Sequence, residues 1–227
     1  MLLLQERDTE LCRLQGGNDR DRALFFNSFF FHQLLNPTTN EYNYSAVAKW
    51  TKYDVFLLKR LYFPLNYPVN SHWTLFTVDI NLRLIRYYDP MSGEANSHAN
   101  ILKRWLLDEA KDKDVREFID VEWTVKYVKH MPKQTGSTAC GVLLILCANC
   151  LSLDKQFDYD MDSVPEARVN IGCAILSGCL GKIEGLQKPL DLPGSWVEDI
   201  MSGRRLSSKL QLNLVNKKDS EALVVDG

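Results

Sequence analysis

Apolar positions among charged residues mark the start of the chain. Residues 1–15 place Leu4, Cys12 and Leu14 between charged side chains at a near-helical spacing. The glycine pair at 16–17 is able to end a helix. We therefore predict a first helix over residues 1–15.

The next two apolar segments differ in how clearly their period can be read. Residues 22–35, RALFFNSFFFHQLL, are so uniformly apolar and aromatic that helix and strand both remain open. Residues 44–61 place Val47 and Trp50 on one face and predict an amphipathic helix. The sequence YFPLNYPV that follows predicts an extended segment.

Two β-rich runs within residues 72–89 predict an antiparallel hairpin. If Ile80 and Asn81 form the loop, His72 lies directly opposite Asp89. Facing side chains project to the same side with Cβ atoms about 4.5–5.5 Å apart, which is the distance at which a carboxylate can orient an imidazole. An ordinary ion pair at the end of two strands is the alternative, and a slip of one residue changes the face.

Further elements complete the predicted fold. Residues 95–113 have a helical charge pattern, residues 122–132 alternate like a strand, and the apolar run at 140–153 is long enough to predict a buried helix. A last helix is predicted over residues 164–182. Helices before and after a central hairpin, with an extra strand, predict an α+β fold.

The amino-acid composition of the chain changes near its end. Beyond Gln187 it becomes rich in proline, glycine and polar residues. We expect residues 1–186 to form one domain and residues 187–227 to be an appendix that is ordered near Trp196 and Ile200 and frayed at its end.

Composition and charge exclude several classes of protein. With 45% hydrophobic residues the chain of 227 residues is able to form a core, and a formal charge of -2 provides no basic footprint for nucleic acid. The start, MLLLQERDTELC, lacks the features of a signal peptide or membrane anchor. We expect an intracellular protein whose six cysteines remain thiols.

Cys140 is placed where a thiol can react. It follows a Gly/Ser/Thr-rich turn and opens an apolar run, and a thiol at a helix N-terminus beside a histidine has a lowered pKa. Gly141 allows a substrate backbone to approach closely. The alternative for Cys140 is a buried core thiol, and that is the interpretation adopted for Cys147 and Cys150, whose C-x-x-C lies inside the predicted helix.

Gln134, six residues before Cys140, adds a possible oxyanion donor. Its amide and the Cys140 backbone N–H could together stabilise a tetrahedral intermediate. The acidic run from Asp158 lacks the glycine and glutamate of a calcium loop, and the other histidines lack zinc-ligand spacing. We therefore expect no metal and no cofactor.

The order His72, Asp89, Gln134, Cys140 resembles that of the sentrin/SUMO-specific proteases, adenain-like cysteine peptidases that process ubiquitin-like proteins. Their gaps of 17 residues from His72 to Asp89 and six from Gln134 to Cys140 also match. The resemblance covers roughly residues 1–185. It rests on FFNSFFFHQL, AVAKWTK, HWTLFTVDINLRLIRYYDPMSG and PKQTGSTACGV.

The resemblance implies a papain-like or adenain-like fold, with a central, mostly antiparallel sheet flanked by helices. It implies that Cys140 is the nucleophile, His72 the general base, Asp89 the residue that orients it and Gln134 an oxyanion donor. Trp73 then matches the tryptophan that walls the narrow tunnel for a C-terminal Gly-Gly.

The chain departs from the family pattern at three places. A W-L-N-D stretch usually precedes the first helix, whereas Met1 here lies already within the predicted helix, so we expect this substrate-contact stretch to be missing. Ala139 stands where Asp is common before the cysteine, and Pro90 follows Asp89 where the family has Ser.

The predicted function is that of a cysteine isopeptidase or endopeptidase that cleaves after the C-terminal Gly-Gly of a ubiquitin-like modifier. SUMO is favoured as partner, with NEDD8 or ubiquitin as alternatives, and the protein is expected to be a monomer in the nucleus or cytoplasm without nucleic-acid or membrane partners. Two rivals remain: a non-catalytic module that binds the modifier, and an acyltransferase with the same Cys and His.

Overall fold

The computed structural model describes residues 1–14, 16–18, 22–36 and 38–177. The chain divides into two compact units, Met1–Met161 and Asp162–Gly227. The second unit contains α5 (Val164–Ser177), which agrees with the predicted last helix as far as the described residues extend. The predicted appendix at 187–227, and with it the domain boundary, lies outside the described residues and stays a prediction.

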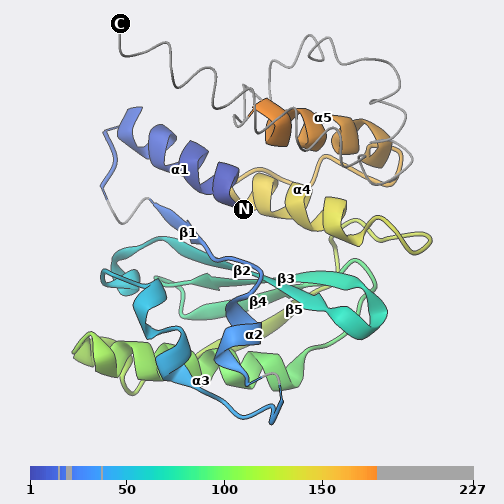
Figure 1. Cartoon of the computed structure of the whole chain (residues 1–227). Coiled ribbons are helices and arrows are strands. Elements are labelled where there is room, and N and C mark those ends of the chain that lie inside the picture. Colours follow the sequence, from blue (N-terminus) through green and yellow to red (C-terminus); the bar gives the residue numbers. More distant parts are fainter. Residues whose placement is uncertain (15, 19–21, 37, 178–227) are drawn as a thin grey trace, which may run out of the picture. The chain divides into compact units, whose positions relative to one another are not determined.

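A five-stranded sheet forms the centre of the first unit, with strands in the order β1-β2-β3-β4-β5 (Figure 1). The inner strands β2, β3 and β4 are antiparallel neighbours, whereas β1 is parallel to β2 and β5 is parallel to β4. This mixed sheet, with its helices, confirms the α+β class. The strands are β1 (Ala23–Phe25), β2 (Arg60–Tyr67), β3 (His72–Asp79), β4 (Leu84–Tyr88) and β5 (Thr124–Val128).

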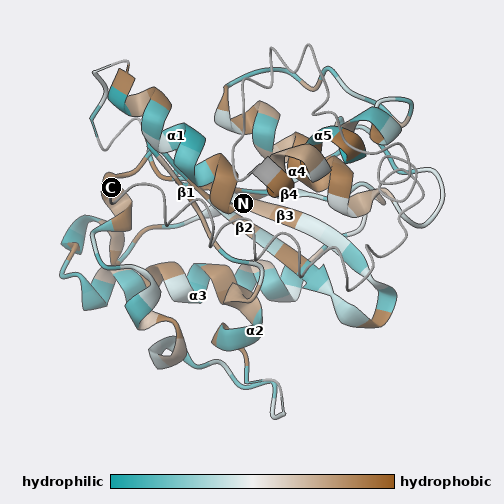
Figure 2. Ribbon diagram, turned by 45° about the horizontal axis from the view of Figure 1, so that its top comes forward, coloured by the Kyte–Doolittle hydropathy of each residue, from teal (hydrophilic) through white to brown (hydrophobic). Residues whose placement is uncertain are grey.

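Helices cover both faces of this sheet: α1 and α4 lie over one face, and α2 and α3 lie over the other (Figure 1). Along most of its length α4 is coloured hydrophobic in Figure 2, and seven of its thirteen residues are buried. Among the described residues, no helix combines the length and apolar character needed to cross a membrane. The helices of this unit are α1 (Leu2–Leu14), α2 (Phe30–Leu34), α3 (Asn96–Asp112) and α4 (Cys140–Ser152).

The main core lies between the sheet and α3. Trp105 of α3 is fully buried, and its ring meets those of Phe26, Phe30 and Phe63 at centroid distances of 5.5, 5.2 and 5.4 Å. Aromatic pairs at such distances contribute more than their buried area alone. The aromatic segment whose structure the sequence left open supplies two of these rings: Phe26 directly follows β1, and Phe30 begins α2.

The start of the chain folds as predicted. The first helix, α1, ends where the glycine pair begins: Gly16 has a φ of +65°, and the backbone N–H of Gly17 donates to the Cys12 carbonyl at 2.9 Å. A left-handed residue after the last turn lets the following backbone N–H groups donate to carbonyl groups that have no hydrogen-bond partner within the helix.

The predicted helix at 44–61 is wrong. This segment forms short 3-10 helices and enters β2 at Arg60. Tertiary hydrogen bonds hold the irregular path, because the Tyr44 and Thr51 hydroxyls both donate to the buried Glu109 carboxylate of α3, at 2.8 and 2.5 Å. Side-chain anchors of this kind override local helix propensity.

The strand β2 carries a proline in its interior. Pro64 pairs with Leu75 of β3 on one side, whereas β1 pairs only with residues 60–62 on the other. Proline has no N–H to donate and is tolerated where a strand lacks a second neighbour. The extended segment predicted after the supposed helix therefore becomes a strand of the sheet.

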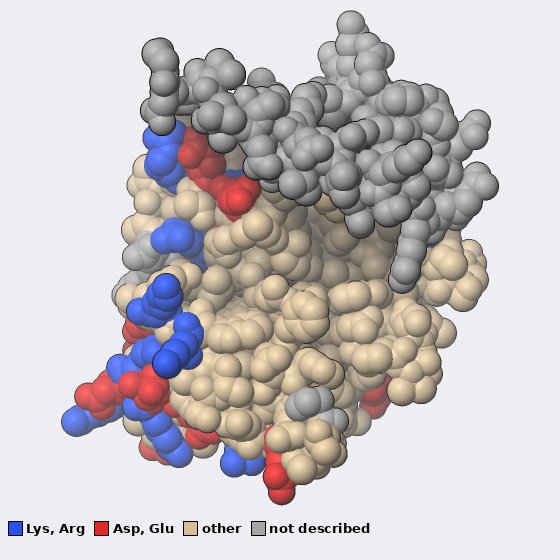
Figure 3. Space-filling model, viewed as in Figure 1, with Lys and Arg blue, Asp and Glu red and all other residues tan. Residues whose placement is uncertain are grey.

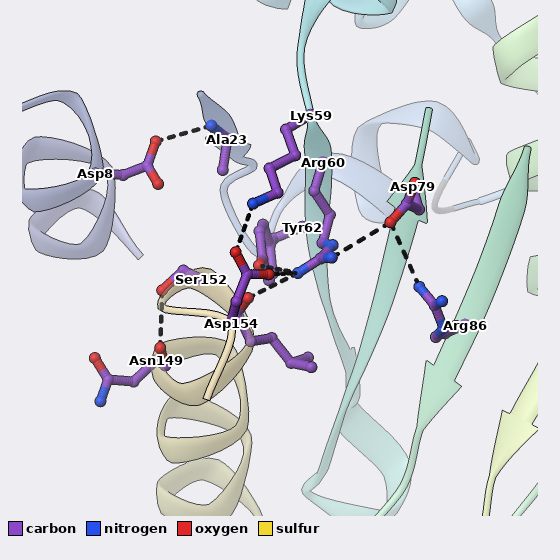
Figure 4. A network of polar contacts seen from close by, with 11 residues as sticks. Asp8, Ala23, Lys59, Arg60, Tyr62, Asp79, Arg86, Asn149, Ser152 and Asp154 are labelled. Carbon is purple, nitrogen blue, oxygen red and sulfur yellow. Dashed lines mark hydrogen bonds and ion pairs between the residues drawn. The ribbon is translucent and has the colours of Figure 1, made fainter. Parts of the chain in front are cut away.

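A polar network connects α1 and the C-terminal end of α4 to the sheet (Figure 4). The guanidinium of Arg60 on β2 donates to the Leu151 carbonyl at 2.7 Å and pairs with Asp79 at 3.3 Å. The guanidinium of Arg7 on α1 donates to the side chains of Asn149 and Ser152. These contacts fix one end of α4, and the other end of this helix carries Cys140.

Candidate active site

The hairpin of β3 and β4 has a wider loop than predicted. Asp79 pairs with Leu84, so the turn spans Ile80–Arg83 and the register is shifted by two residues from the predicted one. The Asp79 carboxylate accepts from the backbone N–H of Leu82 at 3.1 Å, and Arg83 has a φ of +49°. A side-chain-capped turn with one left-handed residue thus replaces the two-residue loop.

The two-residue shift leaves His72 and Asp89 on the same face of the hairpin, because only an odd slip exchanges the faces. Continuing the observed pairing of Leu75 with Tyr88 places Asp89 opposite Thr74, so that His72 lies diagonally across from it. The predicted contact is nevertheless present: His72 Nε2 lies 2.7 Å from Asp89 Oδ1.

The Asp89 carboxylate is held rigidly. It is 5% exposed and accepts from the backbone N–H of Met91 at 2.7 Å and of Gly93 at 2.9 Å. A Cβ atom at position 93 would lie 2.6 Å from Asp89 Oδ2, so only glycine fits there. The turn DPMSG therefore surrounds the Asp89 carboxylate and holds it so that it also contacts His72.

The imidazole of His72 is oriented from two sides. Its Nε2 faces Asp89, and its ring stacks on that of Tyr67 with a centroid distance of 6.3 Å and an interplanar angle of 18°. The other ring nitrogen, Nδ1, is left for a second partner. A hydrogen bond to one ring nitrogen fixes which nitrogen is able to exchange a proton.

Cys140 is the first residue of α4 and is 4% exposed. Its Sγ donates to the carbonyl of Ser71 at 3.8 Å, and Ser71 directly precedes His72. Ser71 has a φ of +49°, a left-handed conformation that turns its carbonyl toward the thiol. The next residues of both segments also adjoin, since a Cβ on Gly141 would lie 3.5 Å from the Trp73 ring.

The start of α4 provides N–H groups without intrahelical partners. The N-cap residue, Ala139, makes no side-chain capping bond. The first N–H groups of a helix are unpaired within it and favour negative charge nearby. The thiol of Cys140 therefore lies where an anion is stabilised.

Gln134 lies in the loop that leads to this helix start. Its backbone N–H donates to the Pro90 carbonyl at 3.0 Å, which connects the loop to the residue after Asp89. Its side-chain Nε2 donates to the Gly136 carbonyl at 2.5 Å, while Oε1 is buried without a hydrogen-bond partner. Gly136 has a φ of +88°, which a glycine adopts readily.

The other two cysteines of α4 have the surroundings of core thiols, as predicted. Cys147 is fully buried, and this burial raises its pKa. Burial and the nearby Asp158 carboxylate, 3.6 Å from the sulfur, raise the pKa of Cys150 to about 11. Within the part of the chain that the structure describes, no cluster of His, Cys, Asp and Glu side chains is suited to hold a metal ion.

Three neighbours of the site were not predicted from the sequence: Tyr67, the Ser71 carbonyl and Gly93. Gly93 had a readable signal, since a glycine four residues after Asp89 closes the DPMSG turn. The roles of Tyr67 and Ser71 depend on the β2–β3 connection, Pro68–Asn70, which forms a short 3-10 helix between the strands.

A buried thiol opens a helix and contacts the carbonyl of the residue before His72, whose imidazole a carboxylate orients. These are the groups that cysteine peptidases use as nucleophile, base and orienting residue. Residues 9–175 match the model of the family described as "Ulp1 protease family, C-terminal catalytic domain". The chain belongs to this family.

Relatives and solved structures agree with this assignment. The chain is 32% identical to human sentrin-specific protease 5 over 152 residues, which are 66% of this chain and 19% of that protein. It is 28% identical to ubiquitin-like-specific protease 1A of Arabidopsis thaliana over 181 residues, 78% of this chain and 34% of that protein. The chain thus spans only a fifth to a third of these relatives' length.

Two solved structures show the same fold. The first is a SUMO protease Ulp1 whose catalytic cysteine is oxidised to a sulfonic acid, with a TM-score of 0.58 and 25% identity over 70% of this chain and 71% of that one. The second is the Ulp1-like SUMO protease catalytic domain of Chaetomium thermophilum, with a TM-score of 0.63 and 20% identity over 83% and 74% of the two chains.

Proposed function

We propose that this protein is a cysteine peptidase that cleaves after the C-terminal Gly-Gly of a ubiquitin-like modifier, with SUMO the first candidate. The observation that carries the proposal is the 2.7 Å contact between His72 and Asp89, together with the contact of the Cys140 thiol with the carbonyl of Ser71, the residue before His72. The names of the relatives, sentrin-specific and ubiquitin-like-specific proteases, support the substrate class.

In the proposed mechanism, His72 takes the proton of the Cys140 thiol, and the sulfur attacks the carbonyl carbon of the terminal glycine. The carbon–nitrogen bond then breaks, and the departing amine receives the proton from His72. Water, deprotonated by the same imidazole, hydrolyses the thioester and restores the thiol. Asp89 orients the ring and stabilises its cationic form in the transition states.

The negative charge on the substrate oxygen is met by two donors, the Cys140 backbone N–H and the Gln134 side-chain amide. The amide at present donates to the Gly136 carbonyl, and its oxygen is buried without a hydrogen-bond partner. When the Gln134 amide turns toward the oxyanion, it gives up the neutral Gly136 carbonyl and donates to a charged oxygen instead. Such a donor is typically worth about 3 kcal/mol in the transition state.

Trp73 and Gly141 define the substrate path in this proposal. The Trp73 ring lies 3.5 Å from the position of a Cβ on Gly141, so any side chain at 141 narrows the space beside the thiol. We infer that the thin glycine tail of a modifier passes through this space. The proposed partners are the modifier and its conjugates, the proposed location is the nucleus or cytoplasm, and the proposed catalytic form is a monomer without cofactor.

The test uses SUMO, NEDD8 and ubiquitin, each carrying an electrophile in place of its terminal carboxylate. Intact-mass measurement of the full chain after incubation is expected to show one adduct, with SUMO the most reactive, and no adduct with Cys140→Ala. Cys147→Ala is the matched control and should react normally. Folded protein that reacts with none of the three probes would overturn the proposal.

A further inference from the structure

A groove of about 760 Å³ lies at the β4–β5 edge of the sheet, on the face that α4 covers. It is formed by β4, β5 and the segment after β5, together with the last turn of α4 and the loop that follows. Five of its lining side chains are basic and none is acidic: Arg86, Lys126, Lys129, His130 and Lys155. We refer to it as the basic groove.

The sheet register brings two of these cations together. Arg86 of β4 and Lys126 of β5 are direct cross-strand partners and project to the same face. Like charges directly opposite one another destabilise a sheet. Arg86 has a carboxylate within reach, since its Nη1 lies 3.7 Å from Asp79 Oδ2 (Figure 4). Lys126 and Lys129 make no ion pair with any described residue.

Protection of the sheet edge does not account for the whole arrangement. Lysines on an edge strand commonly prevent strand-to-strand association, and Lys126 on β5 is suited to that role. Arg86, however, is on an inner strand, and Lys155 is on the loop after α4, so the cations converge from separate segments. On the face shown in Figure 3, by contrast, basic and acidic side chains are intermixed at the lower left.

Aromatic rings line the same groove. The ring of Phe157 meets those of Tyr88 and His130 at centroid distances of 6.2 and 6.4 Å. A site with cations around aromatic walls offers charge pairing together with apolar contact. Such a site fits an extended polypeptide better than a small isolated anion.

The basic groove is separate from the candidate active site. It meets α4 at Leu151, whereas Cys140 opens that helix, and a rise of about 1.5 Å per residue puts roughly 16 Å between them. The overall charge of the chain, -2, opposes long-range attraction of nucleic acid, so a local basic site favours a shorter acidic ligand.

We propose that the basic groove binds an acidic polypeptide segment, rich in aspartate and glutamate, on a partner protein. The carboxylates pair with Lys126, Lys129 and Arg86, and the rest of the segment packs on the aromatic walls. This second binding surface goes beyond the proposed peptidase function and does not depend on it.

The test measures binding of a fluorescein-labelled, glutamate-rich peptide to the full chain by fluorescence anisotropy. The double variant Lys126→Glu/Lys129→Glu is expected to raise Kd at least about tenfold, because it reverses two exposed charges at the site. Lys49→Glu/Lys52→Glu makes the same change in net charge at two exposed lysines outside the groove and should leave Kd nearly unchanged. Circular dichroism verifies that both variants are folded, and Lys126→Gln/Lys129→Gln replaces the first if it is not.

Equal weakening by the two double variants would show that only net charge matters and would overturn the proposal. Tighter binding of a single-stranded DNA probe of equal charge, lost in the groove variant, would overturn the assignment to a polypeptide. The assay involves neither the thiol nor a modifier, so a failed adduct experiment and a failed peptide experiment are distinguishable.

Discussion

The N-terminal end and the interior of α4 place cysteines in opposite chemical surroundings. Cys140 and Cys147 are both buried, at 4% and 0% exposure, so burial does not separate them. Cys140 adjoins the residue before His72 and has unpaired helix N–H groups around it, whereas Cys147 has a pKa raised by its buried position. Position on the helix and the neighbouring strand therefore distinguish a candidate nucleophile from a core thiol.

Replacing each cysteine by alanine, which removes the thiol, tests this contrast most strongly. Cys140→Ala is expected to lower the rate of modifier cleavage by at least about 10⁴-fold, because no other group supplies the nucleophile. Cys147→Ala should keep its cleavage rate and lose about 1–2 kcal/mol of unfolding free energy, because it leaves a small cavity. Rates with a fluorogenic modifier and urea unfolding measure the two effects.

The reverse pattern would contradict the contrast between the two ends of α4. Full activity in Cys140→Ala, or complete loss of activity in a folded Cys147→Ala, would place the chemistry in the helix interior.

The next largest effect is expected at the imidazole. Asp89→Asn keeps the size of the side chain but presents an uncharged group to His72 Nε2, so both the tautomer and the cationic ring lose support. The rate constant kcat should fall by about 10³–10⁴-fold while KM changes little. Asp108→Asn, at a carboxylate that accepts from the Tyr42 hydroxyl at 2.7 Å, is the control and should keep its activity.

An unchanged kcat for Asp89→Asn would show that the 2.7 Å contact is an ion pair of the strand ends, the alternative that the sequence left open.

The sequence was more informative about the site than about the path of the chain. The contact of His72 with Asp89 follows from strand parity, which survives the two-residue error in register. The start of α4 at Cys140 follows from a turn-forming run before a long apolar one. Such local signals do not depend on distant residues.

The failures occurred where distant residues decide the structure. Residues 44–61 have a helical period, yet Glu109 on α3 binds two of their hydroxyls and holds an irregular segment. No local signal could reveal that acceptor. The left-handed Ser71, whose carbonyl faces the thiol, likewise depends on how β2 connects to β3.

Gly93, which adjoins the orienting residue Asp89, and Gly141, which adjoins the proposed substrate path, are expected to affect different kinetic constants. A Cβ at position 93 would lie 2.6 Å from Asp89 Oδ2, whereas one at position 141 would make an ordinary 3.5 Å contact with Trp73. Gly93→Ala must displace the carboxylate and should lower kcat about a hundredfold. Gly141→Ala should mainly raise KM, because it narrows the path of the substrate tail.

Steady-state kinetics with the fluorogenic modifier separates these two outcomes. If Gly93→Ala changed KM alone, the DPMSG turn would contribute to substrate binding and not to holding Asp89.

The smallest expected effect is the contribution of the Cys150 thiol to the pH dependence of the unfolding free energy. The folded pKa of Cys150, raised to about 11, exceeds that of an unfolded cysteine, about 8.5. The unfolded state therefore releases this proton first, and the stability contributed by the neutral thiol is fully present below about pH 8.5 and lost as the pH rises toward 11. In Cys150→Ala the loss of unfolding free energy across this interval should be smaller than in the unchanged protein. Urea unfolding at pH 8 and pH 10.5 measures the difference, and an equal slope in both proteins would mean that the thiol ionises as freely inside the fold as outside it.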